Sequence, residues 1–234
     1  LRHRRQLGVT TLEARLAGRR HRDEFTLFRD DPQRYQNDHL TRRVLAGLRA
    51  TTPAAGAWLL AADLETAYED IDSDGVRGGT EAEALGEHVR RRASLGLEFT
   101  RDRGPLRLQL GTRLDTRGGD SPRLGASAAA AYRLHRTVTV QASAGSVFRV
   151  PTFTDLYYRD PYSQGDPDLE AESGWAWDAG ATHDDGRWLL RATYFERHED
   201  QLIAWARAAG DTVWNVMNVA DGLVRGVEVQ AGVR

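Results

Sequence analysis

The chain has 234 residues, of which 40% are hydrophobic and 28% are charged, and its 34 acidic residues are balanced by 32 basic ones, all arginine. Its longest nearly unbroken apolar run, Ala54–Ala62, is far shorter than the roughly 18 residues of a membrane-spanning helix, which excludes a helical membrane protein. The basic residues form no tail or stripe, which argues against a nucleic-acid partner, and the absence of cysteine excludes disulfides, a thiol nucleophile and Cys-ligated zinc.

The two ends of the sequence are unlike those of a complete protein. It begins at Leu1 without an initiator methionine, an apolar signal core or a cleavage site, and it stops at Arg234 within a strand-like pattern. We therefore expect an internal segment of a longer protein, folded as a single partial domain over residues 1–234.

Alternation of apolar and polar residues with a period of two dominates the chain and predicts β-strands with one apolar face. Trp58 and Leu64, for example, share one parity, whereas Asp63 and Glu65 share the other. The pattern predicts about eleven strands. They are expected near residues 9–28, 39–51, 58–69, 89–100, 106–115, 124–134, 138–144, 175–182, 190–194, 210–218 and 227–233.

Short and long connections alternate between these strands, which is typical of up-and-down hairpins with all long loops at one rim. We therefore expect an all-β fold, namely an antiparallel up-and-down transmembrane β-barrel segment. Dense charges on one parity, and aromatic residues near strand ends, favour this fold over a soluble β-sandwich or barrel. Those aromatic residues are Trp58, Phe99, Tyr132, Trp175 and Trp188. Tight turns are expected at 52–56, 101–104, 135–136 and 184–186, and long polar stretches at 30–38, 70–86, 116–122, 150–172 and 206–211.

An acidic segment between two of these strands matches the calcium-loop pattern D-x-[DN]-x-[DN]-G-x₅-E. Asp70, Asp72, Asp74 and Glu81 stand at its ligand positions, and carboxylate oxygens are the ligands that calcium prefers. Because the flanking residues include good helix formers, a soluble helix–loop–helix calcium module is one interpretation. Calcium held by an acidic loop on a barrel is a second, and a solvated turn is a third. No other cofactor is expected.

The residues are not arranged for catalysis. No two of the seven histidines stand at metal-ligand spacing on one strand face, and no G-x-S-x-G element occurs. A barrel lipase with serine and histidine at its rim is the enzyme alternative. His88 and Ser94 share a strand parity but stand six residues apart, about 20 Å at the rise of a strand, so they cannot form a dyad. We expect no catalytic site and no enzyme activity.

Four motifs in the last third of the chain resemble, in order, those of TonB-dependent outer-membrane receptors. The segment FRVPTFTDLYY at 148–158 is similar to the FRAPT…LY segment of that family, and GDPDLEAE at 165–172 is similar to its GNPDLKPE element. The next two landmarks are resembled by YF at 194–195 with DQLI at 200–203, and by NVMNVA at 215–220 with GVE at 226–228. The segments RRHRDEF at 19–25, NDH at 37–39 and LGEH at 85–88 are similar to the cobalamin-receptor branch.

The resemblance implies a barrel of twenty-two strands, filled by an N-terminal plug domain whose short motif engages TonB. This chain would supply about eleven of those strands, without the plug and the last strands. Its implied function is active import of a large, scarce nutrient across the outer membrane of a Gram-negative bacterium, with TonB and outer-membrane lipid as partners. Cobalamin is the first ligand expected and a ferric siderophore the second. A passive porin and a soluble calcium-binding module are two further interpretations. Residues 151–172 contain no histidine, which disfavours haem.

The family motifs also imply roles for individual residues. We expect structural roles, such as ion pairs with inward-facing acids and the end of a strand, for Phe148, Arg149, Pro151, Leu156, Asp168, Leu169, Asn218, Gly226 and Glu228. Aromatic residues with adjacent charges suit an amphipathic ligand, although an aromatic girdle at a membrane rim has the same composition. The ligand-binding candidates are Tyr157, Tyr158, Arg159, Tyr162 and Asp166.

Overall fold

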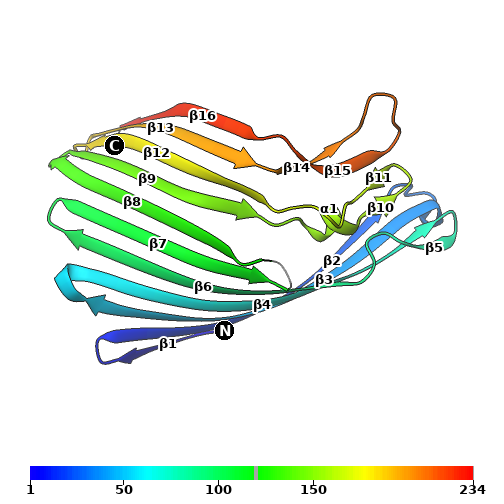
Figure 1. The fold of residues 1–234 in the computed structure, drawn as a ribbon, viewed down its shortest axis with the longest axis horizontal. Coiled ribbons are helices and arrows are strands. Elements are labelled where there is room, and N and C mark those ends of the chain that lie inside the picture. The colour runs from blue at the N-terminus through cyan, green and yellow to red at the C-terminus, as the bar shows by residue number, and fades with distance from the viewer. Residues whose placement is uncertain (119–120, 234) are drawn as a thin grey trace.

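The computed structural model describes residues 1–118 and 121–233, and most of these lie in one antiparallel sheet of twelve strands. Eleven strands are neighbours in the order of the chain, so the sheet is an up-and-down meander (Figure 1). They are β1 (Arg2–Leu7), β2 (Thr10–Thr26), β3 (Tyr35–Ala54), β4 (Trp58–Arg77), β6 (His88–Arg103), β7 (Leu106–Arg117), β8 (Arg123–His135), β9 (Val138–Arg149), β12 (Glu172–Asp184), β13 (Trp188–Asp200) and β16 (Gly222–Val233). The twelfth, β5 (Thr80–Glu83), pairs with the end of β4.

A second, smaller sheet stands at the end of the molecule that carries the long connections (Figure 1). Its strands are β10 (Arg159–Asp160), β11 (Ser163–Gln164), β14 (Leu202–Ala206) and β15 (Trp214–Val219). The helix α1 (Phe153–Tyr157) precedes it, and two 3₁₀ turns, η1 (Pro32–Arg34) and η2 (Ala55–Ala57), close hairpins of the large sheet. Among the described residues, no helix is long and apolar enough to cross a membrane.

The predicted alternation of short and long connections is confirmed. The connections at one end are only two or three residues long, as at Gly104, whose φ of 62° lies in the left-handed region that glycine tolerates best. Those at the other end include 27–34, 78–87, 150–171 and 201–221. The expected connection at 116–122 falls partly on residues 119 and 120, which lie outside the described residues.

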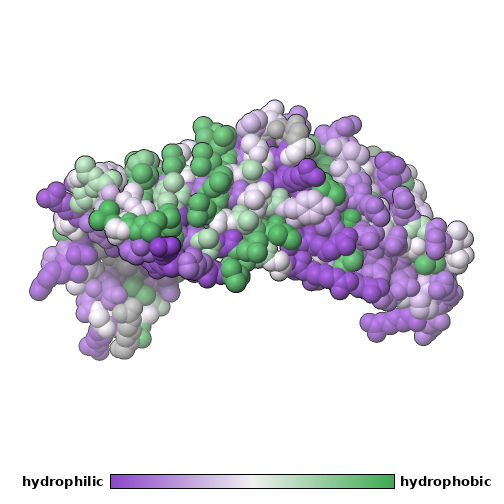
Figure 2. All heavy atoms as spheres, turned by 90° about the horizontal axis from the view of Figure 1, so that it is seen from below, coloured by the Kyte–Doolittle hydropathy of each residue, from purple (hydrophilic) through white to green (hydrophobic). Residues whose placement is uncertain are grey.

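The outer face of the large sheet carries a belt of exposed apolar side chains. The strand register places one leucine opposite the next across five consecutive strands. These are Leu48, Leu64, Leu95, Leu114 and Leu124, and each is at least 40% exposed. Figure 2 shows hydrophobic residues across the middle of the molecule and hydrophilic ones toward the long-connection end. Such a belt faces lipid, because contact between water and so much apolar surface would be unfavourable.

The height of the belt fits a bilayer. On β4 the outward positions run from Trp58 to Tyr68 with Thr66 as their only polar residue, and the next outward residues are Asp70 and Asp72. Ten strand residues span roughly 34 Å, or about 25 Å along the membrane normal for a tilt near 40–45°. That value matches the apolar band of outer-membrane barrels, so β4 continues beyond the lipid by several residues.

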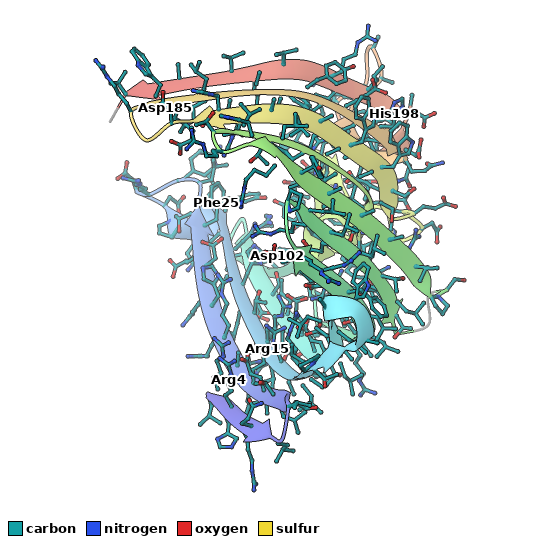
Figure 3. The ribbon with its side chains drawn as sticks, turned by 90° about the vertical axis from the view of Figure 1, so that its left-hand side faces the viewer. Arg4, Arg15, Phe25, Asp102, Asp185 and His198 are labelled. Atoms are coloured by element: carbon teal, nitrogen blue, oxygen red, sulfur yellow. The ribbon has the colours of Figure 1, made fainter. Side chains whose placement is uncertain are left out.

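The inner face carries charged side chains that meet across strands. Arg15 of β2 pairs with Glu65 of β4, two strands away, and Arg113 of β7 lies 3.9 Å from the other oxygen of Glu65. Glycine allows this crossing, because a Cβ on Gly47 of β3 would stand 2.9 Å from the Nε of Arg15. Curvature brings side chains two strands apart closer together on the concave face, and Figure 3 shows Arg15 on that side of the curved sheet.

A second ladder runs beside the first on the inner face. Arg49 lies 3.0 Å from Asp63 and 3.4 Å from Glu98, which again joins alternate strands. Arg113 also pairs with Asp115 at 3.1 Å. The inner face is thus polar and ion-paired while the outer face is apolar. This arrangement is typical of a membrane barrel wall and unlike that of a soluble sandwich.

The structure corrects two strand predictions. The sequence predicts residues 210–218 to be a strand of the wall, but β15 belongs to the small sheet. The eleventh strand of the wall is β1, which the alternation did not predict because its sequence RHRRQL has no apolar face. The acidic stretch that begins at Asp70 is expected to be a loop, but strand β4 continues through it as far as Arg77. Its outward residues are polar because they lie beyond the lipid. The flanks form strands, so the helix–loop–helix module is wrong.

Candidate functional site

Two long connections fold together over the long-loop end of the wall, and we call them the cap: residues 150–171, with α1, β10 and β11, and residues 201–221, with β14 and β15. They join in a shared apolar core made by Leu156, Leu169 and Val216, all buried. Ile203 and Trp205 pack against it. The cap is therefore a packed unit that holds its exposed residues in place.

The helix α1 is fixed at its start by a reciprocal capping box. The backbone N–H of Asp155 donates to Thr152 Oγ1 at 3.0 Å, and the Asp155 carboxylate accepts from the N–H of Thr152 at 2.8 Å. The returning chain passes close by, since a Cβ on Gly165 would stand 2.8 Å from the carbonyl oxygen of Asp155. Only glycine fits there without displacing the helix.

Arg149 joins the wall to both parts of the cap. Its guanidinium donates to both oxygens of Glu172, at 2.6 and 2.7 Å, and lies 3.4 Å from Asp155. Glu172 also accepts from the backbone N–H of Ile203 at 2.7 Å. The hydrogen bonds from Arg149 and Ile203 lower the pKa of the Glu172 carboxyl, although partial burial opposes them. Through these contacts Arg149 fastens the cap to the wall.

The inner face of β6 supports the start of the cap from below. Arg90 donates to the carbonyl oxygen of the buried Pro151 at 2.8 Å and lies over the ring of Phe153, 4.4 Å from its centroid. The ring of His88 stacks on Tyr157 with 3.5 Å between centroids. Phe153 is buried with Ile71 and Leu85 in a second apolar cluster, so α1 rests on the wall.

Tyr158 connects the cap to the tip of β3. Its hydroxyl lies 3.0 Å from that of Tyr35 and donates to Asp160 at 3.1 Å. Burial and these neighbours raise the pKa of the Tyr158 hydroxyl well above its usual range, so it stays protonated and can donate. The guanidinium of Arg77 lies over the Tyr35 ring at 3.6 Å. Tyr158 is therefore a fastening residue with little surface for a ligand.

Two exposed aromatic residues lie on neighbouring backbone segments at the edge of the cap. The backbone N–H of Trp214 donates to the carbonyl oxygen of Tyr162 at 2.7 Å, while the strand register sets Trp214 opposite Ser163. Tyr162 is 67% exposed and Trp214 is 43% exposed. Arg207 lies over the Trp214 ring at 5.1 Å from its centroid. This edge can bind an amphipathic molecule by stacking and charge.

The ligand-binding candidates from the sequence divide into two groups. Tyr162 and Arg159 are exposed, whereas Tyr157 and Tyr158 are half-buried in contacts within the protein. Asp166 closes a turn, because its carboxylate accepts from the N–H of Asp168 at 2.9 Å. Sequence reasoning missed Trp214, since its stretch was assigned to a wall strand.

The residues predicted to have structural roles lie at different places in the wall and the cap. Asn218 bridges the two parts of the cap, because its amide group bonds to the N–H and C=O of Glu170 and to the C=O of Gln201. Gly226 of β16 leaves room for the Phe195 ring, which a Cβ would approach to 2.9 Å. The others are Phe148, half-exposed at the end of β9; Leu156 and Leu169, buried in the cap core; Asp168, exposed; and Glu228, exposed on β16.

The acidic motif has a different geometry from that of a calcium loop. Asp70, Asp72 and Asp74 stand at alternate positions of β4, which places their side chains along one face of an extended strand. Asp70 accepts from Arg42 at 2.7 Å, and Glu81 lies on β5. Within residues 1–118 and 121–233, no three acidic, histidine or cysteine side chains gather to hold a metal ion. Calcium binding there stays a prediction of the motif.

An apolar outer belt, a charged inner face and a packed cap over the long loops define a wall of an outer-membrane barrel. The family model described as TonB dependent receptor-like, beta-barrel, matches residues 3–234. The chain therefore belongs to the TonB-dependent receptor family, in its β-barrel part. Receptors and transporters make up this family, in agreement with the expectation of a protein that is not an enzyme.

Three relatives illustrate the likeness. The vitamin B12 transporter BtuB of Photobacterium profundum is 36% identical over 111 residues, which cover 44% of this chain and 17% of that protein. A ferric enterobactin receptor (PfeA) variant from Pseudomonas aeruginosa superposes with a TM-score of 0.81 at 16% identity, over 98% of this chain and 40% of that one. The siderophore receptor PirA from Acinetobacter baumannii superposes with a TM-score of 0.79 at 13% identity, over 99% and 41%. The chain thus spans less than half the length of these relatives.

Proposed function

We propose that this chain is the barrel part of a receptor in the Gram-negative outer membrane that imports cobalamin with energy supplied through TonB. The observation that carries the choice of ligand is the 36% identity to a vitamin B12 transporter. Residues 19–25, 37–39 and 85–88, which resemble the cobalamin-receptor branch, support it. The solved neighbours bind siderophores by their names, but their identity of 13% and 16% to this chain carries no ligand assignment.

The cap supplies a binding edge for such a ligand. Tyr162 and Trp214 offer aromatic faces to a flat macrocycle, and Arg159 and Arg207 are exposed on the same cap segments. The anchors at Arg149, Asn218 and Tyr158 preorganise this edge, which lowers the entropy lost on binding. Release of the ligand into the barrel would require these anchoring contacts, or whatever fills the barrel, to move. In this proposal TonB supplies the energy for that step.

Titration of the full-length receptor with cyanocobalamin and, separately, with ferric enterobactin tests the ligand. We expect saturable binding of cyanocobalamin, and a loss of at least tenfold in affinity in Tyr162→Ala with Trp214→Ala. Met217→Ala is the matched control, because Met217 lies on the same strand β15 with 42% exposure and should leave affinity unchanged. Binding of ferric enterobactin alone would replace cobalamin by a siderophore as the ligand.

Uptake in cells tests the energy source. Accumulation of labelled cobalamin by a strain that depends on this receptor should stop when TonB is deleted. Accumulation that continues unchanged without TonB would mean passive diffusion, as in a porin, and would overturn the active mechanism.

A further inference from the structure

A recess of about 600 Å³ lies in the inner face of the wall, below the cap and toward the short connections. It crosses the wall strands from β7 to β16 and opens toward the barrel interior. Val147 lines its upper end, two residues along β9 from the anchor Arg149. The recess is therefore next to the cap, but it contains neither Tyr162 nor Trp214.

Two register rows on the inner face explain the recess. The lower row consists of Gln109, Ala129, Ser143, Asp178 and Phe195. The row above it consists of Gly111, Ser127, Gly145, Ala176 and Arg197. Mostly small residues thus occupy β8, β9 and β12 in the middle. Larger side chains bound them, with Gln109 on one side and Phe195 and Arg197 on the other.

The recess differs from the ion-paired half of the inner face. In that half, Arg15 and Arg49 each reach an acidic residue two strands away and cover the strand between. In the recess there is no room for such side chains. A Cβ on Gly111 would stand 2.7 Å from Oγ of Ser127, and one on Gly145 would stand 3.4 Å from Cβ of Ser127. Small residues therefore keep this part of the wall hollow.

Hydrogen-bonding groups line the recess, with little free positive charge. Gln109 is exposed, and its amide forms no hydrogen bond among the described residues. The Asp178 carboxylate accepts from the hydroxyl of Ser143. The Nε of Arg197 lies 2.9 Å from a carboxylate oxygen of Glu199, which offsets the charge of the guanidinium. A ligand here meets free donors and acceptors, but no cation without a counter-charge.

These groups select the kind of ligand surface that fits. A carboxamide is uncharged, and it can both donate to the Asp178 carboxylate and bond to the Gln109 amide. The half-buried ring of Phe195 adds an apolar contact at the side. An anionic group would face Asp178 at close range and be repelled. The volume is within the range of ligand sites, but it holds only one side of a large molecule.

We propose that this recess is a transient station on the import route, where a carboxamide-bearing face of the ligand rests after leaving the cap. The inference depends on the proposed import of a large nutrient, and it assigns part of the route to the inner face of β8, β9 and β12. Gln109 and Asp178 supply the hydrogen bonds, and Phe195 supplies the apolar contact. The contacts are few, so the ligand can leave again.

Binding and uptake, measured together on the full-length receptor, test the proposal. Ala129→Trp fills the recess, and we expect unchanged affinity for cyanocobalamin at the cell surface but uptake at least tenfold slower. Thr100→Trp is the matched control and should change neither quantity. Thr100 is half-exposed like Ala129 and shares the inward parity of Glu98, but it lies on β6 in the ion-paired half.

The outcomes separate this proposal from the proposed function. Failure of the unaltered receptor to bind cyanocobalamin would overturn the proposed ligand and the station with it. Normal binding with full uptake in Ala129→Trp would overturn the station alone. Gln109→Leu guards against misfolding, because it keeps the size of an exposed side chain and removes the free amide. It should slow uptake with unchanged affinity, and full uptake in this variant would also overturn the station.

The charge of the ligand shows whether the recess contacts the ligand itself. A cobalamin derivative with one peripheral amide hydrolysed to a carboxylate should enter at least fivefold more slowly than cyanocobalamin, because it faces Asp178. Asp178→Asn removes the repulsion and should bring the two uptake rates together. An unaltered ratio of the two rates in Asp178→Asn would mean that the recess contacts another part of the barrel interior, and would overturn the proposal.

Discussion

The wall and the cap are stabilised in different ways. In the wall, most large apolar side chains are exposed on the outer face, and each strand is positioned by backbone pairing with its neighbour. In the cap, apolar side chains such as Leu156 and Val216 are buried together, and side chains join segments distant in sequence, as Asn218 joins Glu170, 48 residues away. The wall needs lipid to cover it, whereas the cap folds as the core of a soluble protein does.

This difference determines where a substitution acts. A change on the outer face of the wall alters the energy of membrane insertion, which is a property of the whole barrel. A change in the cap core alters only the local equilibrium between a docked and a detached cap. The two regions should therefore respond to different experiments.

The largest effect is expected from Leu156→Ala in the cap core. Removing a buried leucine side chain costs about 2–5 kcal/mol, because the lost contacts leave a cavity. Hydrogen exchange should show loss of protection in residues 150–171 and 201–221 while the wall strands keep theirs. Met217→Ala, exposed on β15, is the control. Equal loss of protection in wall and cap would mean that the two regions are a single cooperative unit.

Leu95→Arg on the outer face should destabilise the wall by about 2–4 kcal/mol, since Leu95 stands near the middle of the apolar belt. Gln109→Arg on the neighbouring strand β7 places the same charge on the inner face and should cost much less. Urea unfolding in lipid vesicles measures both. Similar costs for the two variants would contradict the assignment of faces.

The sequence predicted the wall well because alternation is a local pattern, and a strand with one lipid face displays it directly. Alternation does not tell which sheet a strand joins, and so WNVMNV at 214–219 was placed in the wrong one. It also fails on β1, where His3 and Arg5 are polar although they pair with Ala14 and Leu12 of the apolar parity of β2. It fails again on β4 past Tyr68, where the outward residues lie beyond the lipid and are polar.

The cap was harder to predict from sequence. Tyr157, Tyr158 and Tyr162 have the same local composition, yet only Tyr162 stays open, because His88 and Tyr35 cover the other two from distant strands. The role of Trp214 depends on its backbone bond to Tyr162, a contact between residues 52 positions apart in the chain. Family motifs marked the anchor Arg149, whose partner Glu172 lies within a second motif.

Acid should weaken the attachment of the cap through Glu172. Hydrogen bonds from Arg149 and Ile203 depress the pKa of Glu172 below the ordinary 4.5, so their stabilisation is complete above that pH and is lost as the pH falls through the lower, folded-state value. Because Arg149 is half-exposed, the effect should be about 1 kcal/mol. Hydrogen exchange of the cap as a function of pH measures it. Glu172→Gln should be weaker at neutral pH and insensitive to acid, and an unchanged acid response in that variant would assign the effect to another group.

The smallest expected effect concerns His39, at the part of β3 beyond the lipid. Burial lowers its pKa from the ordinary 6.5, even though Asp23 and Asp38 act in the opposite direction, and its Nδ1 lies 2.6 Å from the hydroxyl of Ser73. A histidine held neutral in the folded state costs nothing above pH 6.5 and reduces stability as the pH falls below it. The exchange protection of the β3–β4 tip should therefore decline between pH 6.5 and 5, where Glu172 remains ionised and the cap stays docked. His39→Gln should abolish that decline, and a cap that loosened over the same range would show that the tip of the wall and the cap open together.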